Sequence, residues 1–174
     1  MIESLSMKLA TRIKQENPDH PASLEVLKFS IAAVLNVFGT IILSVTVAIL
    51  LDHLWATVIA MVAFAALRGV SGGYHLNSSV GCLLITSAIA NILPYIQLSD
   101  TIVVVFTVIS MILALLFATN NIENQTRIPK KYFPLLRAVS VILIATNFIF
   151  QSDVVALAFL LQALSLIRIG GERE

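Results

Sequence analysis

The chain has 174 residues, of which 58% are hydrophobic and 12% charged, and its formal net charge is +1 at pH 7. Soluble domains are about 25% charged, and the apolar residues here fall in long blocks, so an ordinary soluble globular domain is excluded. No basic cluster is dense enough for nucleic-acid binding. The single cysteine excludes an intramolecular disulfide framework, and His53, His75 and Cys82 offer too few ligands for a metal site. We therefore expect no metal and no cofactor.

Residues 1–28 are predicted to form a cytoplasmic, interfacial amphipathic segment. Its apolar side chains recur at spacings of three and four, as on one face of a helix: Ile2, Leu5, Leu9 and Ile13. Ser4 is a candidate N-cap, and Asn17-Pro18 is expected to end the helix. A basic amphipathic helix ahead of apolar spans is typical of a segment lying on a membrane surface. The alternative is a frayed, solvated terminus, since short helices are marginal without a surface to bind.

Six apolar runs then predict an all-α, polytopic integral membrane protein with about six transmembrane helices in residues 29–167. The runs are 29–51, 54–67, 82–96, 101–118, 138–150 and 154–167. Several are shorter than the roughly 20 residues that a span needs, so we expect their helices to extend into flanking polar residues or to sit in a thinned bilayer. Residues 1–174 are expected to form a single membrane-embedded domain.

The positions of the charged residues support this count. All eleven lysines and arginines lie in the N-terminal segment, in the loops 68–81 and 119–137, or in the C-terminal tail. The alternate connections, at 52–53, 97–100 and 151–153, each carry an aspartate instead. Six spans would place every cation on one face, which the positive-inside rule makes cytoplasmic. Both termini, the 68–82 loop and the basic 119–137 loop are therefore predicted to be cytoplasmic.

The stretch 68–82, Arg-Gly-Val-Ser-Gly-Gly-Tyr-His-Leu-Asn-Ser-Ser-Val-Gly-Cys, is a polar, glycine-rich interruption between two apolar runs. It holds His75 and Cys82, the residue types needed for a thiolate nucleophile and its general base. An ordinary thiol, with a pKa of about 8.5, is mostly protonated at neutral pH. His75 could accept the proton, and the start of a helix favours an anion. One continuous helix would separate the pair by about 10.5 Å along its axis, so we expect His75 to precede the helix that carries Cys82.

Each of these residues also has a structural interpretation. Cys82 could be an inert buried thiol, and His75 could be a polar loop residue. Arg68, at the end of an apolar run, could be a snorkelling anchor. Gly69 and Gly73 form a small-xxx-small pair that could pack helices together. The residues alone do not choose between these alternatives and catalysis.

Arg68, Gly73, His75 and Cys82, in the order R-x-x-x-G-G-x-H-x-x-x-x-x-x-C, resemble the signature of the accessory gene regulator B (AgrB) family. Its members are bacterial integral-membrane cysteine endopeptidases that process quorum-sensing pro-peptides. The resemblance covers nearly the whole chain, including its length, its basic amphipathic start and its pattern of about six spans. It also includes a pair of lysines in the loop after the fourth span.

The resemblance implies a thiol protease of the bacterial cell membrane in which Cys82 attacks a peptide carbonyl and His75 transfers protons. The acyl-enzyme thioester would then be closed into a thiolactone or lactone by a thiol or hydroxyl of the retained fragment. The implied partners are a short amphipathic pro-peptide (AgrD-like) and membrane lipid, with no nucleic acid, and a homodimer fits the family. Asn77 or Ser78 could orient His75, and the sequence does not choose between them.

The resemblance also assigns candidate roles in oxyanion stabilisation or substrate binding to Arg68, Gly73, Lys130 and Lys131. Anchoring for Arg68, and topology for the lysines, remain open beside these roles. The rival class is a non-catalytic polytopic membrane protein, such as a small transporter or an assembly partner. It would depend on polar residues within the spans: Asn36, Asn91 and Gln162. These residues are uncharged and scattered, which argues against an ion-coupled carrier.

Overall fold

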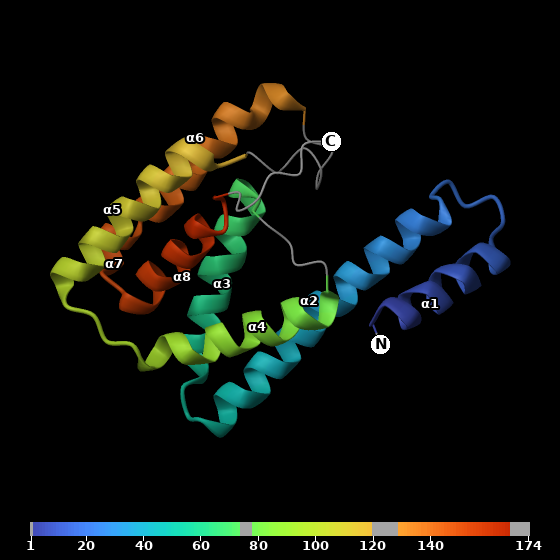
Figure 1. The fold of residues 1–174 in the computed structure, drawn as a ribbon, viewed down its shortest axis with the longest axis horizontal. Coiled ribbons are helices and arrows are strands. Elements are labelled where there is room, and N and C mark those ends of the chain that lie inside the picture. Colours follow the sequence, from blue (N-terminus) through green and yellow to red (C-terminus); the bar gives the residue numbers. More distant parts are fainter. Residues whose placement is uncertain (1, 74–77, 120–128, 168–174) are drawn as a thin grey trace. The chain divides into compact units, whose positions relative to one another are not determined.

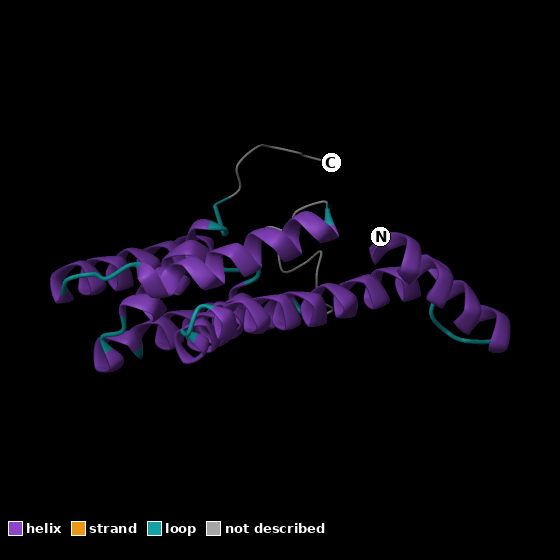
Figure 2. Ribbon diagram, turned by 90° about the horizontal axis from the view of Figure 1, so that it is seen from below, coloured by secondary structure: helices purple, strands orange, loops and turns teal. Residues whose placement is uncertain are grey.

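The computed structural model describes residues 2–73, 78–119 and 129–167. In these ranges the chain forms eight α-helices and two short 3₁₀ helices, and Figure 2 shows only helices and connecting loops there. The all-α class is therefore confirmed for the described residues. Their contacts divide the chain into two compact units. Unit 1 comprises Met1–Asp52 and His75–Asn91, and unit 2 comprises His53–Tyr74 and Ile92–Glu174.

Unit 1 begins with a helical hairpin. Helix α1 (Ile2–Glu16) packs against the start of α2 (Leu24–Leu50), as Figure 1 shows. The predicted N-terminal helix is thus confirmed, and it is not a frayed terminus. The Ser4 cap is wrong, because the helix already includes Ile2 and leaves Ser4 inside its first turn. Ser23 is the N-cap of α2, where its hydroxyl accepts the Val26 N–H at 3.3 Å.

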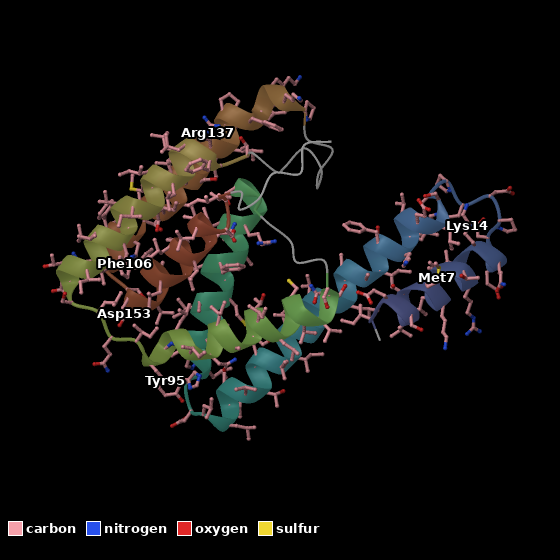
Figure 3. The ribbon with its side chains drawn as sticks, viewed as in Figure 1. Met7, Lys14, Tyr95, Phe106, Arg137 and Asp153 are labelled. Carbon is pink, nitrogen blue, oxygen red and sulfur yellow. The ribbon has the colours of Figure 1, made fainter. Side chains whose placement is uncertain are left out.

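Helix α1 contacts the rest of its unit through small side chains. Ser6 and Ala10 are fully buried. The large apolar side chains are exposed instead: Leu5, Met7, Leu9 and Ile13. Figure 3 labels Met7 on this helix and also Lys14, whose Nζ donates to the His20 carbonyl oxygen in the turn to α2. An exposed apolar face suits the predicted position at a lipid interface.

Helix α4 (Ser79–Ile92) completes unit 1 and approaches α2 closely. A Cβ atom placed on Gly39 of α2 would lie 2.6 Å from Leu83 Cδ1 of α4. One turn further along α4, the Ser87 hydroxyl donates to the Thr40 carbonyl oxygen at 3.4 Å. Gly39 thus leaves room for the Leu83 side chain where the two helices touch.

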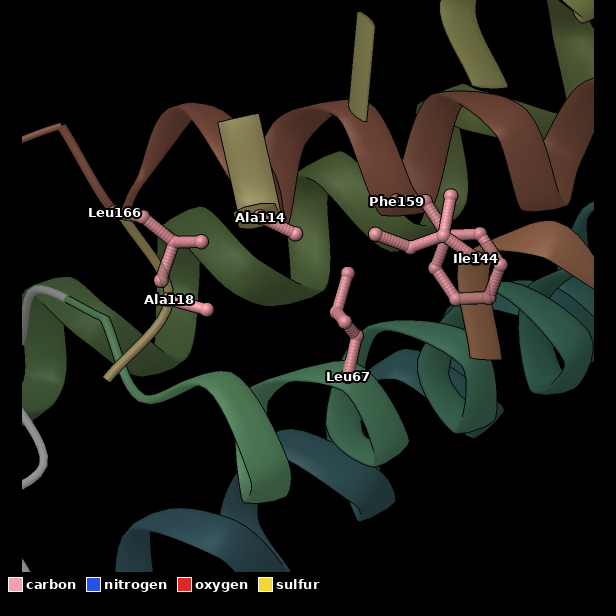
Figure 4. Packing of buried hydrophobic residues seen from close by; sticks show 6 residues of the cluster. All are labelled: Leu67, Ala114, Ala118, Ile144, Phe159 and Leu166. Carbon is pink, nitrogen blue, oxygen red and sulfur yellow. The ribbon is translucent and has the colours of Figure 1, made fainter. Parts of the chain in front are cut away.

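Unit 2 contains the remaining helices: α3 (Leu54–Ser71), η1 (Leu93–Tyr95), α5 (Asp100–Phe117), η2 (Lys130–Tyr132), α6 (Phe133–Ala145), α7 (Asn147–Phe150) and α8 (Asp153–Leu164). Helix α8 packs on both α3 and α5, and α6 contacts the same two helices. Most of α8 is buried, as expected for a helix that is apolar all round. The core of the unit is shown in Figure 4 and consists of Leu67, Ala114, Ala118, Ile144, Phe159 and Leu166.

The C-terminal ends of α3, α5 and α8 meet at one end of unit 2. The Thr119 N–H, just after α5, donates to the Ser71 carbonyl oxygen at 2.9 Å, and Gln162 of α8 bonds to Gly72. At the other end, before α3 begins, the His53 ring makes an edge contact with Tyr95, with ring centroids 5.0 Å apart. Gly72 and Tyr95 therefore lie at opposite ends of unit 2.

Four helices are long and apolar enough to cross a membrane: Leu24–Leu50, Leu54–Ser71, Asp100–Phe117 and Lys130–Phe150. These helices mark the chain as a multi-pass membrane protein. The other two predicted spans are also helical but shorter, at Ser79–Tyr95 and Asp153–Leu164, so the count of six is not confirmed and stays a prediction. Some of the short spans extend into flanking polar residues as expected, whereas α8 ends at Leu164, before the predicted residue 167. Helix α3 continues past Leu67 to Ser71, and the fifth span starts well before residue 138.

Candidate active site

Cys82 lies in the first turn of α4, and that turn is capped by a nearby serine. The Ser78 hydroxyl accepts the Gly81 N–H at 3.2 Å, and the Ser78 carbonyl oxygen accepts the Cys82 N–H at 2.9 Å. The capping residue of α4 is thus Ser78, and not the adjacent Ser79. Cys82 is a free cysteine and is half-buried. Helix α4 begins at Ser79, which confirms that His75 precedes the helix that carries Cys82.

The other member of the predicted pair, His75, lies outside the described residues, as does Asn77. The contact between His75 and Cys82 therefore stays a prediction. Ser78, the second candidate for orienting His75, uses its hydroxyl oxygen as the cap acceptor. A hydroxyl that accepts one hydrogen bond can still donate another, so the cap does not remove Ser78 from consideration.

In unit 2, the segment that leads toward His75 is held by a buried glutamine. Gln162 of α8 is 0% exposed. Its Nε2 donates to the Gly72 carbonyl oxygen at 2.6 Å and to the Ser71 hydroxyl at 3.3 Å. Its Oε1 accepts from Arg68 Nη1 at 3.4 Å and from the Ser165 hydroxyl at 3.2 Å. Both ends of the amide are therefore engaged at the C-terminal end of α3.

Two consecutive glycines lie against this glutamine, and each needs to be glycine. Gly72 and Gly73 have φ angles of +77° and +136°, in the region that side chains disfavour. A Cβ atom on Gly73 would lie 2.8 Å from Ser165 Oγ and 3.0 Å from Gln162 Nε2. Gly69 is different, because it is exposed and nothing lies within 4 Å of its Cβ position. The small-xxx-small interpretation is therefore wrong within the described part of this chain.

Arg68 and the lysine pair are placed differently. Arg68 is half-buried, bonds to Gln162, and holds its guanidinium carbon 5.9 Å from the centre of the Phe64 ring. It is thus part of a polar network and more than a snorkelling anchor. Lys130 and Lys131 are exposed in the 3₁₀ turn that precedes α6, and Lys131 lies over the Tyr132 ring. The proposed roles of these three cations in substrate binding stay predictions.

The same end of unit 2 holds a second half-buried arginine. Arg137 of α6, labelled in Figure 3, donates from Nη2 to the Ala118 carbonyl oxygen at 3.2 Å. Its Nε is buried and has no hydrogen-bond partner among the described residues. The adjacent residue, Thr119, bonds to Ser71 with its own φ at +78°. Arg137 therefore ties α6 to the end of α5, and Thr119 ties that end to the segment that Gln162 also contacts.

Sequence reasoning did not place Gln162, Ser71 or Ser165 at the site. One signal was present, because Gln162 is the only polar residue of α8 after its first position. A lone polar side chain in an apolar membrane helix usually has a specific partner. The partner itself was not readable, since it is a backbone carbonyl 90 residues away. Within the described ranges, no three His, Cys, Asp or Glu side chains come together as a metal site would require.

The sequence that carries Arg68, Gly73 and Cys82 can also be compared with known protein families. The family model described as accessory gene regulator B matches residues 6–167. The chain belongs to the AgrB family. The match extends over both units and includes the 68–82 loop and all of α8.

Two curated AgrB relatives share parts of the sequence. An AgrB-like protein of Halalkalibacterium halodurans is 33% identical over 86 residues, which cover 49% of this chain and 44% of the relative. An AgrB-like protein of Lactiplantibacillus plantarum is 31% identical over 114 residues, covering 65% and 57% respectively. The chain thus spans about half the length of the curated relatives it matches. No solved structure matches the chain significantly.

Proposed function

We propose that this AgrB-family protein is a membrane cysteine endopeptidase that processes a short quorum-sensing pro-peptide. Membership of the family over residues 6–167 supports the reaction class. The observation that carries the proposal is the placement of Cys82, whose half-buried thiol lies in a serine-capped first helical turn. Reactive cysteines are commonly found at helix N-termini. His75, seven residues earlier in the sequence, is the proposed base.

The proposed reaction has two steps. The Cys82 thiol passes its proton to His75, and the sulfur attacks the carbonyl carbon of the scissile peptide bond. The C–N bond breaks, the imidazolium of His75 protonates the departing amine, and an acyl-enzyme thioester remains. A thiol or hydroxyl of the retained fragment then attacks the thioester. The ring closes as a thiolactone or lactone, the C–S bond to Cys82 breaks, and the proton of the attacking thiol or hydroxyl passes through His75 to the Cys82 sulfur.

The second step needs water to be kept from the thioester. Hydrolysis would give an open acid, whereas an internal nucleophile gives a ring. Cys82 is followed by the apolar body of α4, so its acyl group would lie at the edge of an apolar region. The predicted cytoplasmic position of this edge would also give access to a newly made peptide.

The alternative interpretation as a transporter relied on polar residues within the spans, and one of these, Gln162, is already engaged. Gln162 bonds to the protein's own backbone and neighbours through both ends of its amide, so it is not available to a cargo. Asn36 and Asn91 keep buried Oδ1 atoms that have no hydrogen-bond partner among the described residues. Those two positions are where a transport function would have to be sought.

The proposal can be tested without a known substrate, since Cys82 is the only cysteine. The protein in nanodiscs is treated with iodoacetamide, and the alkylation rate is followed from pH 6 to pH 9. We expect wild type to react about tenfold or more faster than His75→Ala at neutral pH, because only the thiolate reacts. His20→Ala is the matched control, since His20 lies in the turn between α1 and α2, and should react like wild type. Equal rates in wild type and His75→Ala would overturn the pairing.

A further inference from the structure

We propose that Gln162 is a positioning residue for the peptidase site and that it acts by fixing the Gly72–Gly73 backbone from which the His75 segment starts. The inference rests on the proposed function, since it assigns a task to the segment that carries the general base. It concerns a residue of α8 that no motif marks and that lies 90 residues from its partner carbonyl. Gln162 touches no reacting atom in this scheme.

The first argument is that the hydrogen bonds of Gln162 are directed at the end of α3. The bond from Nε2 to the Gly72 carbonyl oxygen, at 2.6 Å, is its shortest. The Gly72 N–H is already bonded to the Arg68 carbonyl oxygen at 3.0 Å. Both polar groups of the Gly72 backbone are therefore held. A buried amide bond of this kind is costly to leave unmade.

The second argument comes from the glycines. Positive φ at both Gly72 and Gly73 turns the chain sharply at the end of α3. Gly73 is buried so closely against Gln162 and Ser165 that no side chain would fit. Glycine adopts these φ angles without strain, so the two glycines permit a turn that other residues would resist. The glycines and Gln162 together define the direction in which the chain leaves α3.

The third argument concerns Arg68. Its Nη1 bonds to the same amide, through Oε1, so the glutamine orients the guanidinium as well as the backbone. One side chain therefore controls two features of the 68–82 loop that the proposed function needs: the start of the His75 segment and the nearest arginine. Because His75 follows Gly73 by only two residues, a shift of the Gly72 carbonyl would be passed on to the base.

The test compares Gln162→Met, which keeps the length of the side chain but cannot hydrogen-bond, with a control that loses an equally buried amide. Asn147, 1% exposed, donates to Thr107 Oγ1 at 3.1 Å and pairs with the Ser152 backbone. These contacts lie at the α7 turn and do not involve residues 68–73. Asn147→Leu therefore removes a buried polar network of similar extent from the same unit.

Two readouts are taken in nanodiscs: iodoacetamide alkylation of Cys82 at neutral pH, and hydrogen–deuterium exchange of a peptide covering 68–78. For Gln162→Met we expect alkylation to slow by about 10- to 100-fold, toward the His75→Ala rate, and exchange in that peptide to rise. Asn147→Leu should leave both at wild-type values. Ser165→Ala, which keeps both Nε2 bonds of Gln162, should change the rate by less than about threefold.

A double variant separates positioning from general loosening. If Gln162 and Gly73 act through one arrangement, Gln162→Met with Gly73→Ala should react no more slowly than either single variant. Wild-type alkylation in Gln162→Met, or equal slowing in Asn147→Leu, would overturn the positioning role. If instead His75→Ala is alkylated as fast as wild type, the pairing of His75 with Cys82 in the proposed function is overturned, whatever Gln162→Met does. The two failures are therefore distinguishable in a single experiment.

Discussion

The two ends of the 68–82 loop are built in different ways. At the Cys82 end, the helix is started by Ser78, four residues before the thiol, and both hydrogen bonds described for that turn are local. At the Gly73 end, the backbone is held by Gln162, which comes from the far end of the chain. The nucleophile thus depends on short-range capping, whereas the segment leading to the proposed base depends on the packing of α8 against α3. Substitutions at the two ends should therefore differ in how much they lower stability and the rate of Cys82 alkylation.

The largest effect is expected at Cys82 itself. Cys82→Ala removes the nucleophile and should lower pro-peptide processing by at least about a thousandfold. The assay reconstitutes the protein with a candidate pro-peptide, encoded by a short reading frame near its gene, and detects the ring product by mass spectrometry. Far-UV circular dichroism and gel filtration should match wild type, since a half-buried thiol contributes little to folding. Continued ring formation by Cys82→Ala would remove Cys82 from the mechanism.

The second-largest effect is expected at Gly73, where the backbone is held by residues distant in the sequence. Gly73→Ala places a Cβ 2.8 Å from Ser165 Oγ at a φ of +136° and should destabilise the protein by about 1–3 kcal/mol. Alkylation of Cys82 should slow by about tenfold or more. Gly69→Ala is the matched control: it is an exposed helical position with open space and should stabilise by up to about 1 kcal/mol. Thermal unfolding in detergent measures both, and similar losses in the two variants would contradict the Gly73 assignment.

The smallest effect is expected at Ser78, where the hydrogen bonds lie within one helical turn. Ser78→Ala removes the cap of α4 and should cost about 1 kcal/mol, with a severalfold loss of Cys82 alkylation at neutral pH. Ser79→Ala, one residue later, leaves the cap bond intact and should differ little from wild type. Hydrogen–deuterium exchange at the start of α4 should rise only in Ser78→Ala. An effect that is larger for Ser79 than for Ser78 would show that the cap has been misassigned.

Much of this site could be anticipated because its signals are short-range. A serine before an apolar run predicts a cap, and Ser78 provides it. Paired glycines in a polar interruption predict an unusual turn, and Gly72 and Gly73 both have positive φ. The Ser4 cap failed because several polar residues near a helix start can each fit the local rule. The Gly69–Gly73 pair failed because residue spacing indicates a helix face but does not say whether a neighbour covers it.

The amino-acid sequence by itself determined that the chain is helical and membrane-spanning, which residues form its apolar helices, and that Cys82 follows a helix start. Those properties depend on hydropathy and on contacts within a few residues. Only the tertiary structure decided that Gln162 would meet Gly72, that Arg68 would join that amide, and that Gly69 would remain uncovered. The physical reason is that a buried amide takes whichever partner the packing of α8 against α3 brings to it, and packing between distant helices leaves no local signal.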